Sequence, residues 1–469
     1  MNVEDLIRLG APRGEAAHRG VDFAARYLLR GGEKERLRQE IAAIVRDPQA
    51  YAKDPVAREF AKALLKAPRP AVPGGAGAEG RAPIPCRYWG SDLGEEVHLQ
   101  MERACQLPVA VAGAVMPDAH PGYGLPIGGV LATENAVVPY AVGVDIACRM
   151  KLTVLDLKVL DLERKAERLR KAIESETRFG VGASFQHQRR EHEVLDEDWS
   201  VSPVTLANKD RGWAQLGTSG SGNHFVEFGR FTVTDPSVGL EAGEYVALLT
   251  HSGSRGTGAQ VCEHYSRRAA DLHPDLPKEL RRLAWLPLDT EVGQEYWAAM
   301  ELMGRYAAAN HALIHRHVAE HLGAEVLLGI ENHHNFAWKE VHFGREVVVH
   351  RKGATPAGEG VLGVIPGSMA TPGYVVRGKG NAESLRSAAH GAGRAVGRKV
   401  AQKTFTWEKA QRVLRANGVT LLSAGLDEVP MAYKDIHQVM AAQADLVEVL
   451  GRFDPKIVKM APSGEPPED

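Results

Sequence analysis

Side chains that bind metals recur in this chain where apolar runs end in glycine-rich turns. Asp145 and Cys148 lie three residues apart in VGVDIACRM, so a turn can aim a carboxylate and a thiolate at one ion. His224 follows the turn GSGN, and His251 directly follows the apolar run YVALLT. Because rigid scaffolds present functional groups on loops at strand ends, these four residues are candidates for a metal site.

A further ligand is expected from His333 and His334, which are adjacent in ENHHNF. Neighbouring residues rarely bind one ion, so we expect only one of them to be a ligand. This histidine and the four residues above provide enough ligands for two ions if the thiolate bridges the ions. The Cys/His set first suggests zinc, whereas the carboxylate keeps manganese, iron and cobalt open. The plainer alternatives are a buried cysteine beside a capping aspartate, hydrogen-bonded structural histidines, and a turn that merely ends a strand.

The segment SAAHGAGR indicates a different kind of chemistry. Small residues follow His390, so backbone N–H groups can face phosphate oxygens, and the guanidinium of Arg394 stands four residues further on. This arrangement suits a nucleophilic histidine that attacks a phosphoryl group and splits one difficult transfer into two easier ones. The alternative is an anion-binding helix start with a spectator histidine.

Other basic residues are candidate phosphate contacts, namely Arg255 in HSGSRG and the pair Arg351-Lys352 in HRKGAT. The P-loop pattern GxxxxGKS or GxxxxGKT does not occur, so a P-loop is not the nucleotide site. His311 and His315 are spaced i, i+4 in HALIHRH, but no glutamate follows the first of them as in zinc proteases. We expect this helix to be structural, with its histidines solvated or hydrogen-bonded.

The elements that must position these residues follow from changes of pattern along the chain. Residues 1–66 are rich in Ala, Leu, Arg and Glu at helical spacing, which predicts a small helical N-terminal extension. The Pro/Gly-rich residues 67–85 predict a linker or surface loop. In residues 86–469, β-type runs such as RMKLTVLDL and EVVVHR are separated by glycine clusters and by helical patterns at about 160–175, 291–321, 406–417 and 434–451. This predicts a mixed α/β or α+β domain.

The composition is that of a globular protein with a sizeable core, with 44% hydrophobic and 25% charged residues. A net charge of −2 argues against a bulk-basic nucleic-acid binder but is compatible with a local basic groove. The cysteines have irregular spacings that suggest no disulfide framework. No run approaches the roughly 20 apolar residues of a membrane span, and the N-terminus has no apolar signal core, so we expect a cytoplasmic protein without membrane contact.

Taken in order, ten motifs between about residue 110 and Lys459 resemble those of the RtcB family of RNA-splicing ligases. In this chain they read MPDAHPGYGLPIGG, GVDIAC, GSGNHFVE, HSGSRG, HN, HRKGAT, IPGSM, HGAGR, AYKD and IVK. The resemblance implies one large α+β domain in which central β-sheets, flanked by helices, surround a metal pocket. The chain departs from the family pattern at Arg149, where Gly is common, and at Pro372-Gly373, where a Ser often contacts guanosine.

The resemblance also implies roles for individual residues. His390 would be the guanylylated nucleophile, and Asp118 would assist near the reacting RNA ends. Two manganese ions, bridged by the thiolate, would bind to Asp145, Cys148, His224, His251 and His334. The contacts to GTP or GMP would come from Asn223, His224, Phe225, Val226, Glu227, His334, Asn335, Pro366, Gly367, Ser368, Met369, Gly373, His390, Gly391, Ala392, Gly393, Tyr433 and Lys459.

The reaction implied by the resemblance begins when His390 attacks the α-phosphate of GTP to form a histidine–GMP phosphoramidate. A 2′,3′-cyclic phosphate on RNA is opened to a 3′-phosphate, GMP moves to that phosphate, and a 5′-hydroxyl end attacks to release GMP. The expected partners are broken or spliced RNA ends, such as tRNA halves, and an archease-like protein. Two alternatives stay open: a metal-dependent phosphoesterase that acts on cyclic-phosphate RNA ends with water as nucleophile, and a nucleotide- or RNA-end-binding regulator without catalysis.

Overall fold

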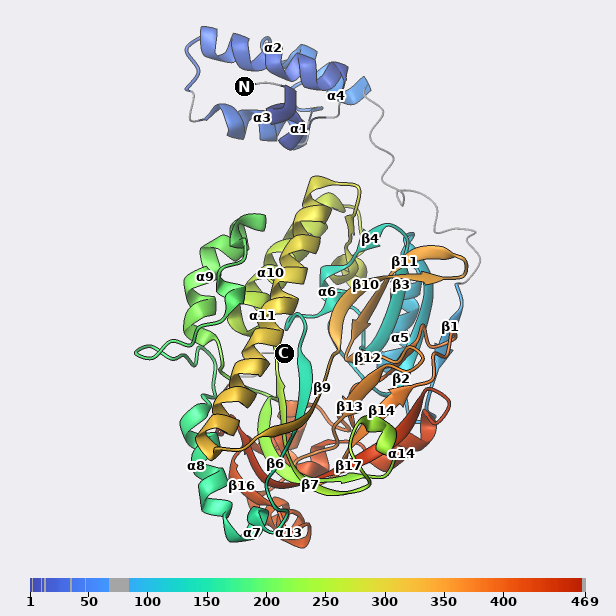
Figure 1. Cartoon of the computed structure of the whole chain (residues 1–469). Helices are drawn as coiled ribbons and strands as arrows, with labels where there is room; N and C mark the ends of the chain where they lie inside the picture. The colour runs from blue at the N-terminus through green and yellow to red at the C-terminus, as the bar shows by residue number, and fades with distance from the viewer. Residues whose placement is uncertain are drawn as a thin grey trace. The chain divides into compact units, whose positions relative to one another are not determined.

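The structure is a computed structural model that describes residues 1, 3–9, 11, 14–33, 36–46, 48–66 and 84–465. The chain divides into two compact units, Met1–Arg81 and Ala82–Asp469 (Figure 1). Most of the predicted linker, residues 67–83, lies outside the described residues, and its last two residues, Ile84 and Pro85, are described.

The first unit is helical and contains α1 (Val3–Arg8), α2 (Glu15–Leu29), α3 (Leu37–Arg46) and α4 (Arg58–Lys66). Apolar residues at helical spacing face inward, and Phe23, Ile41 and Phe60 are buried at its centre. At Gly20 in α2 a β-carbon would lie 2.9 Å from the Phe60 ring, so glycine allows α2 and α4 to approach closely. The small helical extension therefore has a hydrophobic core of its own.

Two β-sheets form the frame of the second unit (Figure 1). One runs in the order β1 (Cys86–Tyr88), β2 (Ala110–His120), β3 (Ile127–Thr133), β11 (Arg345–Lys352), β10 (Asn335–His342). The larger sheet runs in the order β13 (Leu362–Ile365), β14 (Gly373–Gly378), β17 (Val447–Met460), β6 (Phe225–Val233), β7 (Gly243–Ser252), β5 (Arg149–Leu155), β9 (Val326–His333), with β16 (Thr420–Ser423) paired to β17. Smaller pairs join β12 (Ala354–Pro356) to β15 (Ser387–Ala389) and β4 (Ala136–Val137) to β8 (Leu286–Pro287). Most neighbours are antiparallel, whereas β1–β2 and β16–β17 are parallel.

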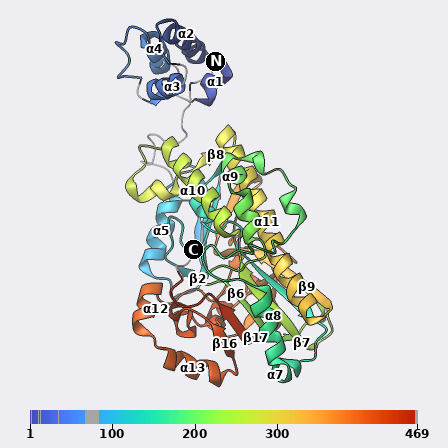
Figure 2. The same ribbon diagram turned by 90° about the vertical axis from the view of Figure 1, so that its left-hand side faces the viewer.

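Helices surround these sheets. They are α5 (Glu95–Cys105), α6 (Pro139–Val142), α7 (Asp161–Arg164), α8 (Ala166–Glu176), α9 (Pro203–Gln215), α10 (Arg255–Leu272), α11 (Glu291–Leu322), α12 (Arg398–Thr404), α13 (Trp407–Ala416) and α14 (Ile436–Ala442). Short 3₁₀ turns lie at Glu193–Leu195, Trp199–Val201, Pro236–Val238, Lys278–Leu283, Leu426–Glu428 and Pro430–Ala432. Figure 2 shows α12 and α13 at one end of the unit, close to β16. No helix in the described part of the chain combines the length and apolar character needed to cross a bilayer.

The helix α11 packs across the larger sheet and carries part of its core. The Thr290 side chain caps it by accepting a hydrogen bond from the Gly293 backbone N–H, and Gly323 ends it with a left-handed φ of 53°. Ile314 and Val318 of α11 belong to one buried cluster with Val226, Phe228 and Leu248 of the sheet. The alternate residues of β6 are thereby left to face the other side of the sheet.

These elements confirm the α+β class, and the helices predicted at 160–175, 291–321 and 406–417 correspond to α7–α8, α11 and α13. The helix predicted over 434–451 is wrong in its second half, because α14 ends at Ala442 and β17 begins at Val447. From there β17 pairs with β14 on one side and, from Gly451 onward, with β6 on the other. Sheet pairing on both sides outweighs the local helical pattern.

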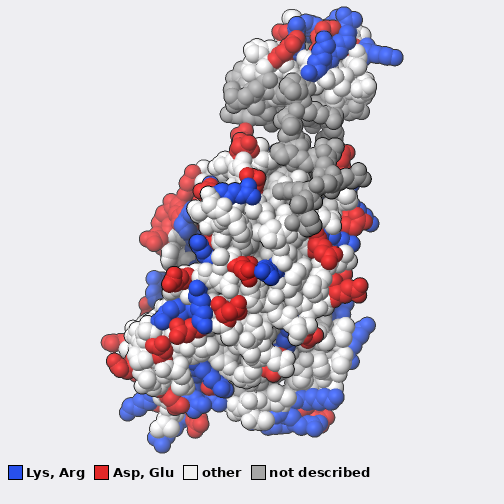
Figure 3. Space-filling view, turned by 90° about the vertical axis from the view of Figure 1, so that its right-hand side faces the viewer, with Lys and Arg blue, Asp and Glu red and all other residues white. Residues whose placement is uncertain are grey.

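Charged side chains are mixed in sign on the surface of the second unit that Figure 3 presents. Blue Lys and Arg side chains lie among red Asp and Glu side chains over this face. This distribution agrees with the nearly neutral net charge of −2.

Candidate active site

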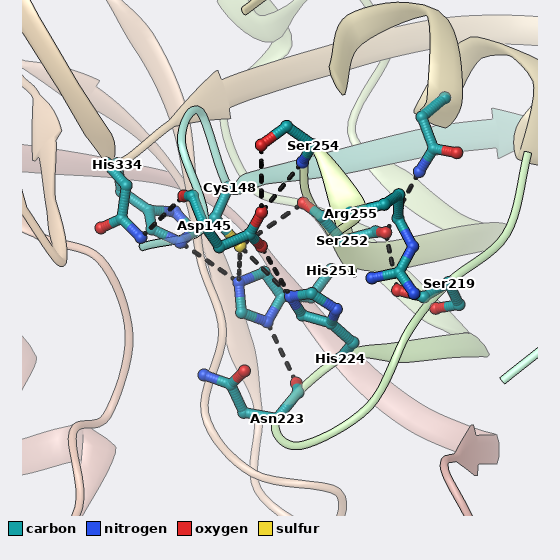
Figure 4. A network of polar contacts seen from close by, with 12 residues as sticks. Asp145, Cys148, Ser219, Asn223, His224, His251, Ser252, Ser254, Arg255 and His334 are labelled. Atoms are coloured by element: carbon teal, nitrogen blue, oxygen red, sulfur yellow. Dashed lines mark hydrogen bonds and ion pairs between the residues drawn. The ribbon is translucent and has the colours of Figure 1, made fainter. Parts of the chain in front are cut away.

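Asp145 and Cys148 lie in a tight turn between α6 and β5. Ala147 adopts a left-handed φ of 57°, and the Cys148 N–H donates to the Asp145 carbonyl at 3.2 Å, so the turn folds back on itself. Both side chains are buried and point towards the segments that carry His224 and His251 (Figure 4). At Gly253, a β-carbon would lie 2.1 Å from Asp145 Oδ2, so only glycine leaves space for this carboxylate.

Three histidines complete the cluster: His224 directly before β6, His251 in β7, and His334 between β9 and β10. Cys148 Sγ lies 3.4 Å from His224 Nε2 and 3.1 Å from His251 Nε2. The ligand atoms of these three residues lie within 4.8 Å of one another. Asp145 Oδ2 lies 3.1 Å from His224 Nε2, and His334 Nε2 lies 3.1 Å from His251 Nε2 (Figure 4). The five side chains therefore form a row with the thiol in the middle.

The charge states of this cluster suit a divalent cation. Burial, reinforced by the neighbouring His224, lowers the pKa of His251 to about 3, and burial together with His390 holds the pKa of His334 well below its ordinary value. Burial alone would raise the pKa of Asp145, but its contact with His224 outweighs burial and lowers it. His334 Nδ1 is buried without a hydrogen-bond partner among the described residues. Neutral imidazoles, an ionised carboxylate and a thiol form a donor set that fits a transition-metal ion.

The orientation of two of the histidines is set by neighbouring backbone. His251 Nδ1 lies 3.0 Å from the Asn223 carbonyl oxygen, which can only accept, so Nδ1 carries the proton and Nε2 offers its lone pair to the cluster. At Gly220, which has a φ of 104°, a β-carbon would lie 2.5 Å from His224 Nδ1. The glycine-rich turn before His224 is thus needed to admit its imidazole.

His390 directly follows β15 and contacts the buried Asp118 of β2. Its Nδ1–H donates to Asp118 Oδ2 at 2.7 Å, and the same oxygen accepts the backbone N–H groups of His390 at 3.2 Å and Gly391 at 3.3 Å. Asp118 has no exposed surface. The proton on Nδ1 leaves Nε2 as the basic nitrogen, and the ring centroids of His390 and His334 are 4.8 Å apart. A nucleophile candidate therefore lies next to the metal-ligand cluster.

A cavity connects His390 with the metal-ligand cluster and with the face of β6 and β17 that is turned away from α8. Of the residues expected at the active site, it is lined by Asn223, Phe225, Glu227, His251, Pro366, Gly367, Ser368, Met369, His390, Gly391, Ala392, Gly393, Arg394 and Tyr433. His120, Ile127, Met150, Glu428, Val458 and Met460 complete its wall. The cavity combines apolar walls with a few polar groups, as small-molecule sites do.

Glu227 is the acidic group on the sheet wall of this cavity. It points there because Phe225 and Glu227 alternate along β6 with Val226, which packs in the core on the α8 side. Burial raises the pKa of Glu227 well above its ordinary value. A planar ligand that offers two parallel N–H donors would favour the charged form again, because a carboxylate accepts a hydrogen bond at each of its two oxygens.

Two polar residues that line the cavity, His120 and Glu428, were not singled out from the sequence. His120 lines it, and burial lowers its pKa to about 4. Glu428 is buried and accepts hydrogen bonds from the Tyr433 hydroxyl and from the guanidinium groups of Arg394 and Arg398. His120 could have been found from the sequence, because it lies two residues after Asp118 on the same strand and so points to the same face of the sheet. Glu428 lies 34 residues from Arg394 and has no local motif.

Several expected nucleotide contacts lie outside this cavity. Lys459 lies on the α8 side of β17, where its ammonium is 5.5 Å from the ring centroid of Phe179. Asn335 joins the metal turn to the backbone before β12, since its amide donates to the Asp145 carbonyl at 3.2 Å and accepts from the Gly353 N–H at 2.8 Å. Gly373 begins β14 and lies behind Pro366.

The expected phosphate contacts divide into two groups. Arg394 lines the cavity. Arg255 is buried next to the cluster, where its Nε donates to Thr218 Oγ1 at 3.1 Å. In contrast, the guanidinium of Arg351 is buried and paired with Glu340 at 2.6 Å, and Lys352 donates to the Tyr123 carbonyl at 2.5 Å. The structure thus gives the Arg351-Lys352 pair internal partners.

Arg149, which departs from the family pattern, is also turned away from the metal-ligand cluster. Its guanidinium donates to Glu331 and to the Gly304 carbonyl, each at 3.2 Å. The charge that follows Cys148 in the sequence is therefore balanced outside the cluster.

Comparison with known proteins identifies the family to which the chain belongs. The family model described as tRNA-splicing ligase RtcB matches residues 100–204 and 196–460. The chain is 34% identical to RNA-splicing ligase RtcB of Escherichia coli over 407 residues, which cover 78% of this chain and 95% of that protein. It is 33% identical to tRNA-splicing ligase RtcB of Methanococcus maripaludis (80% and 92% covered) and 32% identical to the protein of the same name from Nanoarchaeum equitans (81% and 96% covered). With its ordered motifs, its convergent metal-ligand cluster and these matches, the chain belongs to the RtcB family.

Proposed function

We propose that this protein is a GTP- and manganese-dependent RNA ligase that joins 2′,3′-cyclic phosphate or 3′-phosphate RNA ends to 5′-hydroxyl ends, in tRNA splicing or RNA repair. The observation that carries the proposal is the contact of His390 with the buried Asp118 in a cavity that also reaches the metal-ligand cluster. The names of the matched relatives, which are RNA-splicing and tRNA-splicing ligases, support the same reaction class.

The first step uses the lone pair on His390 Nε2. This nitrogen forms a bond to the α-phosphorus of GTP while the bond from that phosphorus to the bridging oxygen of the β-phosphate breaks, and pyrophosphate leaves. Asp118 holds the Nδ1 proton at 2.7 Å and stabilises the positive charge that develops on the ring. Where the RNA end is a 2′,3′-cyclic phosphate, water first opens it to a 3′-phosphate. An oxygen of the 3′-phosphate then bonds to the phosphorus of GMP while the bond from that phosphorus to His390 Nε2 breaks. Finally, the 5′-hydroxyl oxygen loses its proton and bonds to the phosphorus of the RNA 3′-phosphate, and GMP leaves.

The residues that would hold two manganese ions are Asp145, Cys148, His224, His251 and His334, with Cys148 in the middle of the row. Bound there, the ions would withdraw negative charge from phosphate oxygens. The backbone N–H groups of His390 and Gly391 are bonded to Asp118, so the N–H groups that would face phosphate in this cavity are those of Ala392 and Gly393.

Base selection is assigned to Glu227 and Tyr433. Guanine presents two adjacent donors, N1–H and the 2-amino group, which match the two oxygens of one carboxylate. Adenine has an unprotonated N1 and no 2-amino group, so it would leave a buried carboxyl group unpaired, which is costly. Tyr433 lines the same cavity, where its ring can stack on a base.

The experiment that tests the proposal is incubation with manganese and GTP labelled at the α-phosphate, followed by denaturing electrophoresis. We expect a labelled protein band that is labile in acid, stable in alkali and absent from His390→Ala. The matched control is His187→Ala, which removes an exposed histidine and keeps the band. A band of full intensity in His390→Ala would refute the nucleophile. Absence of any band, with retained hydrolysis of cyclic-phosphate RNA ends, would instead favour the phosphoesterase.

A further inference from the structure

His311 and His315 of the segment HALIHRH are buried between α11 and the larger sheet. His311 has no exposed surface and His315 is 3% exposed. Their i, i+4 spacing places both on the face of α11 that meets β5 and β7. They are hydrogen-bonded rather than solvated, and they do not belong to the metal-ligand cluster described above.

These histidines and two threonines form an unbroken chain of hydrogen bonds. His311 Nε2 lies 3.0 Å from the Ser252 carbonyl oxygen, and His311 Nδ1 lies 2.8 Å from Thr250 Oγ1. On the other side of that hydroxyl, His315 Nε2 lies 2.8 Å away, and His315 Nδ1 lies 2.6 Å from Thr153 Oγ1. The chain thus runs from β5 through α11 and β7 to the end of β7.

The carbonyl at one end fixes the direction of every bond. Ser252 O can only accept, so His311 carries its proton on Nε2 and accepts at Nδ1 from the Thr250 hydroxyl. Thr250 Oγ1 then accepts from His315 Nε2–H, and His315 Nδ1 accepts from the Thr153 hydroxyl. Each imidazole must be neutral to donate and accept at once, and burial keeps the pKa of both well below the ordinary value.

The end of this chain contacts the residues around His251 and Cys148. Thr250 and Ser252 are the two sequence neighbours of His251, and both are bonded to His311. The Ser252 carbonyl oxygen is also 3.4 Å from Cys148 Sγ. A metal-bound cysteine carries no S–H group, so the His311 N–H then remains as a donor to this carbonyl and offsets its repulsion with the thiolate.

We propose that His311 and His315 are positioning residues of the metal site, which hold His251 and Cys148 in binding geometry and raise the affinity for the metal. The inference rests on the metal part of the proposed function. The same helix also supports Ser252, at the end of the hydrogen-bond chain. The Asn310 amide donates to Ser252 Oγ at 3.2 Å and to the Thr218 carbonyl at 2.9 Å.

Titration of the metal-free protein with Co²⁺ alone tests this, with the visible spectrum and the sulfur-to-cobalt charge-transfer band as readouts. His311→Leu and His315→Leu interrupt the chain, and we expect about 10- to 100-fold weaker Co²⁺ binding, the range found for residues that support metal ligands. The glutamine variants His311→Gln and His315→Gln keep one donor and one acceptor and are expected to restore binding to within about threefold. His317→Leu, on the same helix and 30% exposed, is the matched control and should bind as the unaltered protein does.

Two threonine variants keep the test decisive if a leucine variant fails to fold. Thr250→Val removes the central hydroxyl at nearly constant volume, and Thr153→Val removes the terminal donor on a strand that carries no metal ligand. We expect both to fold, by circular dichroism and thermal melting, and to bind Co²⁺ more weakly, Thr250→Val by the larger factor. Folded variants that bind Co²⁺ with unchanged affinity and spectrum would overturn the inference. No Co²⁺ binding by the unaltered protein would overturn both this inference and the proposed metal site.

Discussion

Replacement of Asp118 by asparagine separates the charge next to His390 from the geometry of the contact. Asparagine is isosteric and keeps an acceptor for the His390 and Gly391 N–H groups, but it removes the negative charge 2.7 Å from Nδ1. Opposite unit charges about 4 Å apart attract by about 4 kcal/mol at an effective dielectric constant of about 20. If about half of a charge develops on the ring in the transition state, about 2 kcal/mol is lost, which slows guanylylation roughly 30-fold.

The assay for Asp118→Asn is single-turnover formation of the labelled protein band at saturating GTP and manganese, stopped at short times. Asp271→Asn, an exposed position on α10, serves as the matched control and should react at the unaltered rate. Thermal melting establishes that both variants are folded. A rate for Asp118→Asn within threefold of the unaltered protein would refute the electrostatic role of this carboxylate, because Asp118 is the hydrogen-bond acceptor that His390 Nδ1 contacts among the described residues.

Three further predictions follow from the same contacts. Cys148→Ser removes the central donor of the row and should lower bound manganese by at least half, as measured by elemental analysis after gel filtration; full metal content would contradict the bridging thiolate. Glu227→Gln replaces one acceptor by a donor, so the preference for GTP over ATP in adduct formation should fall roughly 10-fold or more, and an unchanged ratio would remove Glu227 from base selection. Burial lowers the pKa of Lys352 to about 8. Between about pH 8 and pH 10.5 the lysine is therefore protonated in the unfolded chain but not in the folded one, so it makes the free energy of unfolding rise with pH. Lys352→Met should flatten that rise in urea melts, and identical pH profiles would show that the ammonium is solvated.

The convergence of the candidate metal ligands could be expected from the sequence because they lie next to the ends of strands. Asp145, Cys148 and His251 are adjacent to apolar runs, and the turns beside them require glycine at Gly220 and Gly253. Spacing alone could not choose between His333 and His334. The structure brings His334 to the cluster, while His333 packs on Phe336 and Trp338.

The cavity walls were harder to predict because they depend on register. The face on which Lys459 lies follows from an irregularity between Pro455 and Ile457 in the pairing of β17 with β6, and no local pattern marks it. The resemblance implies Val226 as a nucleotide contact because it belongs to a continuous motif. The two-residue period of a strand, however, places Val226 and Glu227 on opposite faces of the sheet. Glu428 reaches the cavity only through long-range folding of the chain.

The contact between Gly393 and Asp118 bears on how this protein can change. A β-carbon at Gly393, where φ is 72°, would lie 2.0 Å from the Asp118 carbonyl oxygen, so two backbone segments touch directly next to His390. The distance between Asp118 and His390 is thus set by contacts of the main chain, which side-chain substitutions elsewhere do not remove. Side chains elsewhere on the cavity wall can be exchanged without moving the reacting nitrogen. Under the proposed function, substitutions on the cavity wall can therefore change the preferred base or RNA end while the position of His390 is kept.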